Sequence, residues 1–146
     1  MTIASILGAK GVDVVTVTPD MPVTAVIHLL AERRIGAVPV IDGAIDGGTV
    51  AGVFSERDVI RCLDSGGAAS LDGPVGAVMT APAVTVTPGE SVIGALSLMT
   101  RRRIRHLPVV EDGRVIGFVS IGDLVKHRID RIEAEASAML DYIQQA

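Results

Sequence analysis

The strongest constraint on the fold is that most of the chain is written twice. Residues 15–41 (VTVTPDMPVTAVIHLLAERRIGAVPVI) align without a gap with residues 84–110 (VTVTPGESVIGALSLMTRRRIRHLPVV), at an offset of 69. The offset then falls to 65, so that GVFSERD at 52–58 meets GFVSIGD at 117–123. The first copy carries the four extra residues in DGAIDGGTV, which we expect to be a loop. Such self-similarity predicts two related structural units.

Each copy shows the same order of periodic patterns. Apolar residues recur on one helical face over 23–30 and again over 92–99. The runs GAVPVI and VAGVFS, with their counterparts RHLPVV and VIGFVS, are typical of strands, and the turn at Asp112-Gly113 predicts a hairpin. One copy alone is too small for a solid core. We therefore expect an α/β (α+β) fold of two β-α-β-β-α units, packed face to face as pseudo-symmetric halves. The boundaries that we expect are 1–63 for the first unit, 64–73 for the linker, 74–130 for the second unit and 131–146 for a C-terminal helical extension.

The C-terminal segment departs from the repeat. Its apolar residues alternate spacings of four and three, which predicts a long helix with a heptad-like seam. Two interpretations stay open: the seam covers the protein's own core, or it covers a partner subunit. The residues of the seam are Val125, Ile129, Ile132, Ala136, Met139 and Ile143.

Composition excludes several classes of function. The net charge is −4 and only three residues are aromatic, so neither a basic field nor stacking platforms for nucleic acid are expected. No run of about 18 apolar residues predicts a membrane span, and no basic, apolar leader is visible. The single cysteine, Cys62, cannot build a disulfide within the chain or a thiolate metal site by itself. We expect a cytoplasmic protein without a bound metal, and no triad or phosphate-binding loop predicts an enzyme.

The repeated Ser-x-x-Asp pair, at Ser55/Asp58 and Ser120/Asp123, has two interpretations. A Ser followed three residues later by an acid is a capping box, in which both side chains bond to amides at a helix start. The second interpretation is a ligand site, because the acid is Asp in both copies rather than the usual Glu or Gln. An ionised Asp only accepts hydrogen bonds, and a ribose offers two adjacent hydroxyl donors.

These motifs, doubled and in order, resemble a tandem pair of cystathionine-β-synthase-type (CBS) domains, a Bateman module. The resemblance covers about Ser5 to about Ile129 and depends on AVPVI, HLPVV and both copies of Gly-x-x-Ser-x-x-Asp. In this family the Ser/Thr and Asp hold the ribose and α-phosphate of an adenine nucleotide, and the adenine lies between aliphatic residues of the strands. The ligand-binding residues that the resemblance implies are Thr18, Ala37, Pro39, Phe54, Ser55, Arg57 and Asp58 in the first copy, and Thr87, Arg105, His106, Pro108, Val119, Ser120, Gly122 and Asp123 in the second.

The resemblance implies a non-catalytic regulatory module that works as a homodimer and senses an adenine nucleotide. AMP is the first candidate, followed by NAD(H), ATP, ADP and S-adenosylmethionine. Two other classes stay open, namely a structural dimerisation module without a ligand and a regulatory fragment of an IMP-dehydrogenase-like enzyme. The regulated protein partner is not readable from the sequence.

The two sites are not expected to be equivalent. Because the halves face each other, a nucleotide held by the Asp of one half points its phosphate at the other half. The resemblance then implies that the ligand of Asp58 meets residues 105–106, an Arg and a His. The ligand of Asp123 meets the uncharged residues 36–37, with Arg57 as the only cation expected nearby.

Overall fold

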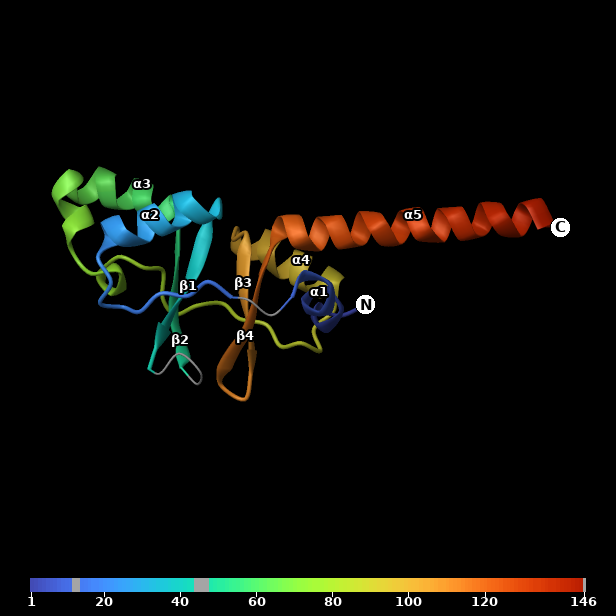
Figure 1. Cartoon of the computed structure of the whole chain (residues 1–146), viewed down its shortest axis with the longest axis horizontal. Helices are drawn as coiled ribbons and strands as arrows, with labels where there is room; N and C mark the ends of the chain where they lie inside the picture. Colours follow the sequence, from blue (N-terminus) through green and yellow to red (C-terminus); the bar gives the residue numbers. More distant parts are fainter. Residues whose placement is uncertain (12–13, 44–47, 146) are drawn as a thin grey trace.

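The computed structural model of the chain describes residues 1–11, 14–43 and 48–145. The middle of the expected loop DGAIDGGTV, residues 44–47, lies outside the described residues. The chain forms two small antiparallel sheets with helices around them, which confirms the α/β prediction (Figure 1). The helices are α1 (Ile3–Lys10), α2 (Val23–Arg33), α3 (Glu56–Gly66), α4 (Val92–Arg102) and α5 (Ile121–Gln145), with the 3-10 helices η1 (Ala68–Asp72) and η2 (Val75–Ala77).

The two sheets are built alike. Strand β1 (Ala37–Asp42) pairs with β2 (Thr49–Ser55), and β3 (His106–Glu111) pairs with β4 (Arg114–Ser120). The register is the same in both, so that Gly52 lies opposite Val40 and Gly117 lies opposite Val109. The repeat seen in the sequence is therefore a repeat in space.

The first predicted strand of each unit is shorter than expected. It contributes only one parallel bridge, between Val17 and Val40 in one half and between Val86 and Val109 in the other. A proline follows two residues later in each copy, Pro19 and Pro88, and proline has no N–H with which to continue a ladder. The pairing consequently stops after one bridge.

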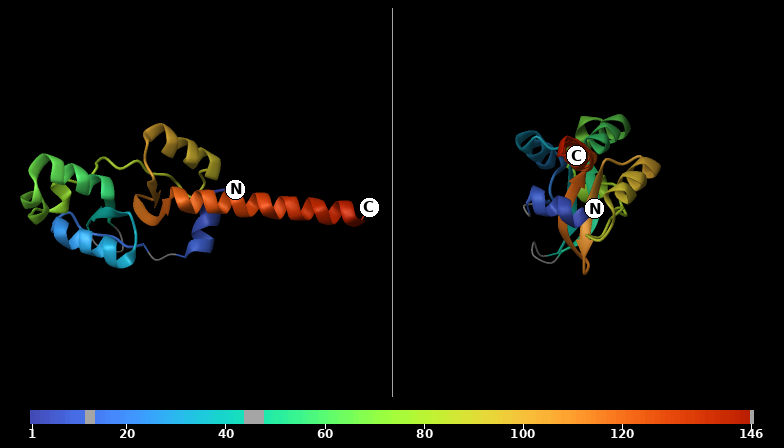
Figure 2. Two further views of the ribbon diagram at one scale, coloured as in Figure 1. Left: turned by 90° about the horizontal axis from the view of Figure 1, so that it is seen from above. Right: turned by 90° about the vertical axis from the view of Figure 1, so that its right-hand side faces the viewer.

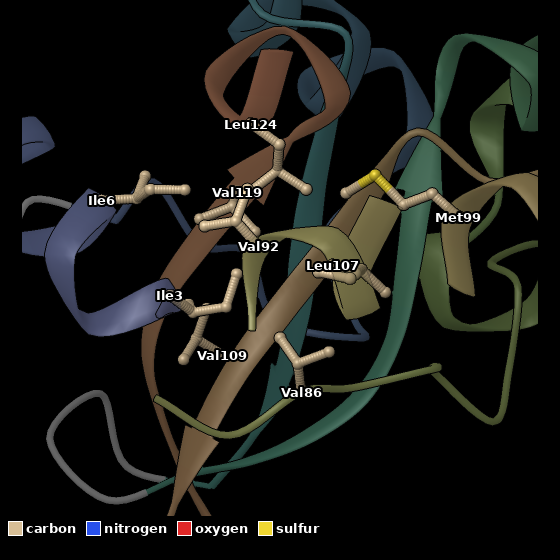
Figure 3. Packing of buried hydrophobic residues seen from close by; sticks show 10 residues of the cluster. Ile3, Ile6, Val86, Val92, Met99, Leu107, Val109, Val119 and Leu124 are labelled. Atoms are coloured by element: carbon tan, nitrogen blue, oxygen red, sulfur yellow. The ribbon is translucent and has the colours of Figure 1, made fainter. Parts of the chain in front are cut away.

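Each half of the molecule completes its hydrophobic core with a short segment that belongs, in the sequence, to the other copy of the repeat. Ile3 and Ile6 of α1 are buried in the core of the second half, among residues of β3, β4 and α4 (Figure 3). In the opposite direction, Val75 of η2 is buried in the core of the first half, where Phe54 and Val38 lie. The offset of 69 aligns Ile6 with Val75, so the two exchanges are equivalent.

The segment expected as the linker, residues 64–73, is structured along most of its length. It contains the end of α3 and the helix η1. The hydroxyl of Ser70 lies within hydrogen-bond distance of the carbonyl oxygens of Cys62 (2.9 Å) and Gly67 (2.7 Å), which share its one proton. These contacts fold the segment back against α3 before the chain reaches η2.

The C-terminal helix α5 projects from the body of the molecule (Figures 1 and 2). Of its residues only Leu124 is fully buried, and every residue from Arg128 to Gln145 is exposed. The seam residues are 41% exposed at Val125, 50% at Ile132 and 61% at Met139. The interpretation that the seam covers the protein's own core is therefore wrong, because the helix leaves the core after its first turns.

The glycine that opens each repeated heptapeptide gives a test of the packing between halves. A Cβ at Gly52 would lie 2.6 Å from the carbonyl oxygen of Thr80, which is backbone, whereas one at Gly117 would meet the end of the Leu7 side chain. Backbone cannot yield as a side chain does, so we expect Gly52→Ala to lower the free energy of unfolding by about 1–3 kcal/mol and Gly117→Ala by less. Urea unfolding of both variants measures this, and a larger loss in Gly117→Ala would contradict the packing described.

Candidate functional site

Two cavities lie where the halves meet, one beside each Ser-x-x-Asp pair. The cavity beside Asp123 measures about 410 Å³ and is walled by α1, β1, β3 and β4. The cavity beside Asp58 measures about 480 Å³. Gly36 and His106 line both, so the cavities share a wall. Volumes of this size are typical of small-ligand sites.

Both Ser-x-x-Asp pairs form helix caps. The amide of Ser55 donates to Asp58 Oδ2 (2.8 Å), and the amide of Ser120 donates to Asp123 Oδ2 (2.9 Å). Both pairs are reciprocal capping boxes, and in the second the amide of Asp123 donates to Ser120 Oγ (3.1 Å). Each cap uses only the Oδ2 oxygen of its Asp, so capping leaves Oδ1 available for another partner.

In the first half Asp58 is buried and its side chain is bonded to other protein groups. Its Oδ1 accepts a hydrogen bond from Thr80 Oγ1 (2.8 Å) and lies 3.3 Å from Arg61 Nη1. The residue is only 2% exposed. Within this structure both oxygens of Asp58 are therefore engaged by the protein itself.

In the second half Asp123 is open. Its side chain is 27% exposed, and Lys10 Nζ lies 2.6 Å from Oδ2. Lys10 also donates to the carbonyl oxygen of Phe118 (2.8 Å). Among the described residues, Asp123 Oδ1 accepts no hydrogen bond. Asp123 thus offers an unbonded acceptor at the wall of a cavity, held beside one cation.

The exchanged segments supply the partners of both carboxylates. Lys10 is the last residue of α1, and Thr80 follows η2. The two residues come from nearly equivalent places in the repeat, because the offset of 69 aligns Thr80 with Gly11, the residue after Lys10. Each Asp is thus contacted from the segment that crosses from the other copy. In one half the contact is a neutral hydroxyl, and in the other it is an ammonium group.

Lys10 also sets the electrostatics of the Asp123 cavity. Burial by itself would raise the pKa of Asp123, but the hydrogen bonds from Lys10 and from the Ser120 amide outweigh it and hold the pKa below its ordinary value. Burial lowers the pKa of His106, and the positive charge of Lys10 lowers it further. The imidazole of His106 stacks on Phe118, with ring centroids 5.5 Å apart. His106 is accordingly neutral at pH 7 and attracts phosphate by charge only in acid.

The structure brings some of the predicted site residues together. Ala37, His106, Ser120 and Asp123 line the Asp123 cavity, and Ser55, Arg57, Asp58, Arg105 and His106 line the Asp58 cavity. The other predicted residues are not among those that line either cavity: Thr18, Pro39, Phe54, Thr87, Pro108, Val119 and Gly122.

Strand alternation explains one part of this difference. Phe54 and Val119 point into the two hydrophobic cores, and their chain neighbours Val53 and Phe118 line the cavities instead. A strict period of two along β2 and β4 would have selected Val53 and Phe118 from the sequence.

The cations are also arranged differently from the expectation. Arg105 and His106, which were expected to meet the ligand of Asp58, line the Asp58 cavity. Arg57, which was expected near the ligand of Asp123, lines the Asp58 cavity and donates to the carbonyl of Arg103 (2.8 Å). The cations of the Asp123 cavity are Lys10 and Arg34, which sequence reasoning missed. Lys10 lies outside the well-aligned part of the repeat, and no local motif marks it.

Comparison with known proteins agrees with this architecture. A family model described as the CBS domain matches residues 9–65 and 75–130. The chain belongs to the CBS-domain family. It is 34% identical over 149 residues to the mitochondrial CBS domain-containing protein CBSX3 of Arabidopsis thaliana, covering 98% of this chain and 72% of that protein. The crystal structure of the CBS-domain containing protein ATU1752 from Agrobacterium tumefaciens superposes with a TM-score of 0.80 at 41% identity, covering 87% of this chain and 92% of that one.

Two further matches cover most of this chain. Inosine-5'-monophosphate dehydrogenase of Mycobacterium bovis is 37% identical over 116 residues, which is 78% of this chain but 20% of that enzyme. The CBS domain pair of protein MJ0100 was crystallised with 5'-methylthioadenosine and S-adenosyl-L-methionine, and it shares this CBS pair's fold with a TM-score of 0.76 at 20% identity, covering 90% of this chain and 98% of that one.

Among the described residues, three or more His, Cys, Asp or Glu side chains are nowhere grouped as a metal ion requires. None of the described helices combines the length and the apolar character needed to cross a membrane.

Replacing Lys10 by Met tests its electrostatic role. Without the ammonium, the pKa values of both Asp123 and His106 should move upward, because Lys10 lowers both. Because the pKa of Asp123 is lower in the folded than in the unfolded protein, the ionised carboxylate stabilises the fold at pH values above the unfolded pKa. This stabilisation is lost as the pH falls through the folded pKa. NMR titration of the two side chains measures the shifts, and Lys126→Met on the exposed face of α5 is the control. Unchanged pKa values in Lys10→Met would contradict the ion pair.

Proposed function

We propose that this protein is a non-catalytic regulatory module that binds an adenine nucleotide in the Asp123 cavity. CBS domain pairs are regulatory modules that often bind adenosine ligands, and the membership of this chain in the family supports the proposal. The observation that carries it is the unbonded Oδ1 of Asp123 at the wall of a cavity lined by both halves. AMP is the first candidate ligand, and NAD(H), ATP, ADP and S-adenosylmethionine come next.

The walls of the Asp123 cavity suit the three parts of a nucleotide. A carboxylate with a free oxygen accepts hydrogen bonds from a ribose diol. The apolar side chains at the wall suit a purine base, and the cations Lys10 and Arg34 suit a phosphate. The apolar lining consists of Leu7, Val14, Val15, Ile35, Ala37 and Phe118.

Lys10 is expected to change partners when the nucleotide binds. In the structure it occupies Oδ2 of Asp123, so a diol that uses both oxygens must displace it. The phosphate of AMP offers the released ammonium a new anionic partner in the same cavity, whereas adenosine offers none. Lys10 would thus favour AMP over adenosine.

The Asp58 cavity is the second proposed site, and it differs in character. A ribose there must displace the Thr80 hydroxyl and Arg61 from Asp58. The cavity is rich in cations, so we expect binding there to depend more on phosphate than binding beside Asp123 does. The arginines that line it are Arg57, Arg61, Arg102, Arg103 and Arg105.

The proposal also includes the organisation of the chain. We propose that residues 1–63 and 74–130 are the two units of the repeat, each of which places its first helix in the core of the other half, that 64–73 link them and that 131–146 are an extension. The module is proposed to act as a homodimer in the cytoplasm, although its relative CBSX3 is named as mitochondrial. One observation favours a structural module without nucleotide, namely that both Asp side chains accept hydrogen bonds from backbone amides as helix caps.

Substitution of the two Asp residues decides between the nucleotide site and the cap. Asp123→Asn removes a charged acceptor for the diol, and hydrogen bonds to charged groups contribute about 1.5–3 kcal/mol, so AMP affinity should fall roughly 10- to 100-fold. Asn still caps a helix, so the fold should persist. Asp58→Asn should lower affinity only at the second proposed site, and Asp130→Asn, on the exposed part of α5 outside both cavities, is the control that should leave AMP binding unchanged. Isothermal titration calorimetry with AMP measures all three.

The outcome that favours the structural alternative is equally definite. If no adenine nucleotide at millimolar concentration raises the melting temperature of the wild-type protein, the Ser-x-x-Asp pairs are caps only. If AMP binds but Asp123→Asn leaves its affinity unchanged, the nucleotide lies elsewhere.

A further inference from the structure

The exposed seam of α5 has no role in the proposed nucleotide site. Residues 128–145 form a projecting helical arm that is exposed along its full length (Figure 2). At a rise of about 1.5 Å per residue, this arm extends about 27 Å. Helices in proteins draw most of their stability from packing an apolar face, and this helix packs only its first turns against the body.

The seam points away from the chain's own body. Leu124 is fully buried against the body, while its neighbour Val125 is 41% exposed. Successive residues of a helix point about 100° apart, so the face that carries the seam is turned away from the face that docks. A second helix can therefore reach the seam without displacing any element of the fold.

The pattern along the seam is that of a coiled coil. With Ile129, Ala136 and Ile143 at the a positions, the d positions are Val125, Ile132 and Met139, so an apolar residue stands at every a and d position of the arm. The seam is widened by Leu140 at e and Tyr142 at g, which are 59% and 74% exposed. We propose that this seam packs against the same seam of a second copy of the chain, as a parallel coiled coil.

The charges beside the seam determine the direction. In a parallel pair, position g of one helix faces position e of the next heptad on the other helix, so Arg128 of each copy faces Glu133 of the other. In an antiparallel pair aligned so that all six seam residues of each helix pack against the other helix, Glu133 of one copy would face Glu133 of the other. Glu135 would likewise face Glu135. Opposite charges meet in the parallel arrangement and like charges meet in the antiparallel one.

Sedimentation equilibrium of the full chain tests the proposal. The wild-type protein should have twice the 15.1 kDa mass of one chain at micromolar concentration. Ile132→Glu places a charge in the middle of the seam and should give a single-chain mass. Ala134→Glu adds the same charge at the f position, opposite the seam, and should remain a dimer. Ile132 is already half exposed, so the body should stay folded, which its thermal unfolding transition monitors.

Cysteine cross-linking tests the direction in a Cys62→Ala background. Ile143→Cys should cross-link to itself only in a parallel pair, because an antiparallel pair places Val125 opposite Ile143. A mixture of Val125→Cys and Ile143→Cys chains should therefore give no mixed product. A mixed product without self-linked Ile143→Cys would overturn the parallel arrangement.

A charge swap provides a third measurement. Arg128→Glu should weaken the dimer roughly three- to tenfold, and Arg128→Glu/Glu133→Arg should restore it. A wild-type monomer, or a dimer that survives Ile132→Glu unchanged, would overturn the proposal. In the second case another surface holds the two copies, and neither result depends on whether AMP binds.

Discussion

The reciprocal exchange of α1 and η2 fixes the two halves of the molecule to each other. Ile3 and Ile6 are buried in the second half, and Val75 is buried in the first. Each such side chain contributes about 1.5–3 kcal/mol when it is fully buried. Neither half could close its core without the segment that crosses over, so the halves cannot separate without opening both cores.

The same exchange builds the candidate sites. The crossing segments end at Lys10 and at Thr80, and these residues contact Asp123 and Asp58. A repeat that is symmetric in its backbone is therefore asymmetric in its chemistry, because one segment delivers an ammonium group and the other a hydroxyl. This difference leaves one carboxylate open to a cavity and the other sealed.

The sequence predicted the features that recur in both copies. The strands, the helices and the Ser-x-x-Asp caps follow from local periodicity and were found in both halves, although the first strand of each was reduced to one bridge. Lys10, Arg34 and Thr80 could not be predicted in the same way, because they reach the cavities through the exchange of segments and not through a motif. Arg57 was placed beside the wrong Asp because its side chain bonds to the carbonyl of Arg103, across the junction.

One helix joins the proposed nucleotide site to the far end of the molecule. Asp123 lies in the first turn of α5, and the helix continues without interruption for 25 residues to Gln145. Its length of about 37 Å makes it a lever whose short end is the capped turn beside the cavity. A tilt of about five degrees at that turn would move the tip by about 3 Å, so a small rearrangement around Asp123 would be amplified into a displacement that a neighbouring molecule can sense.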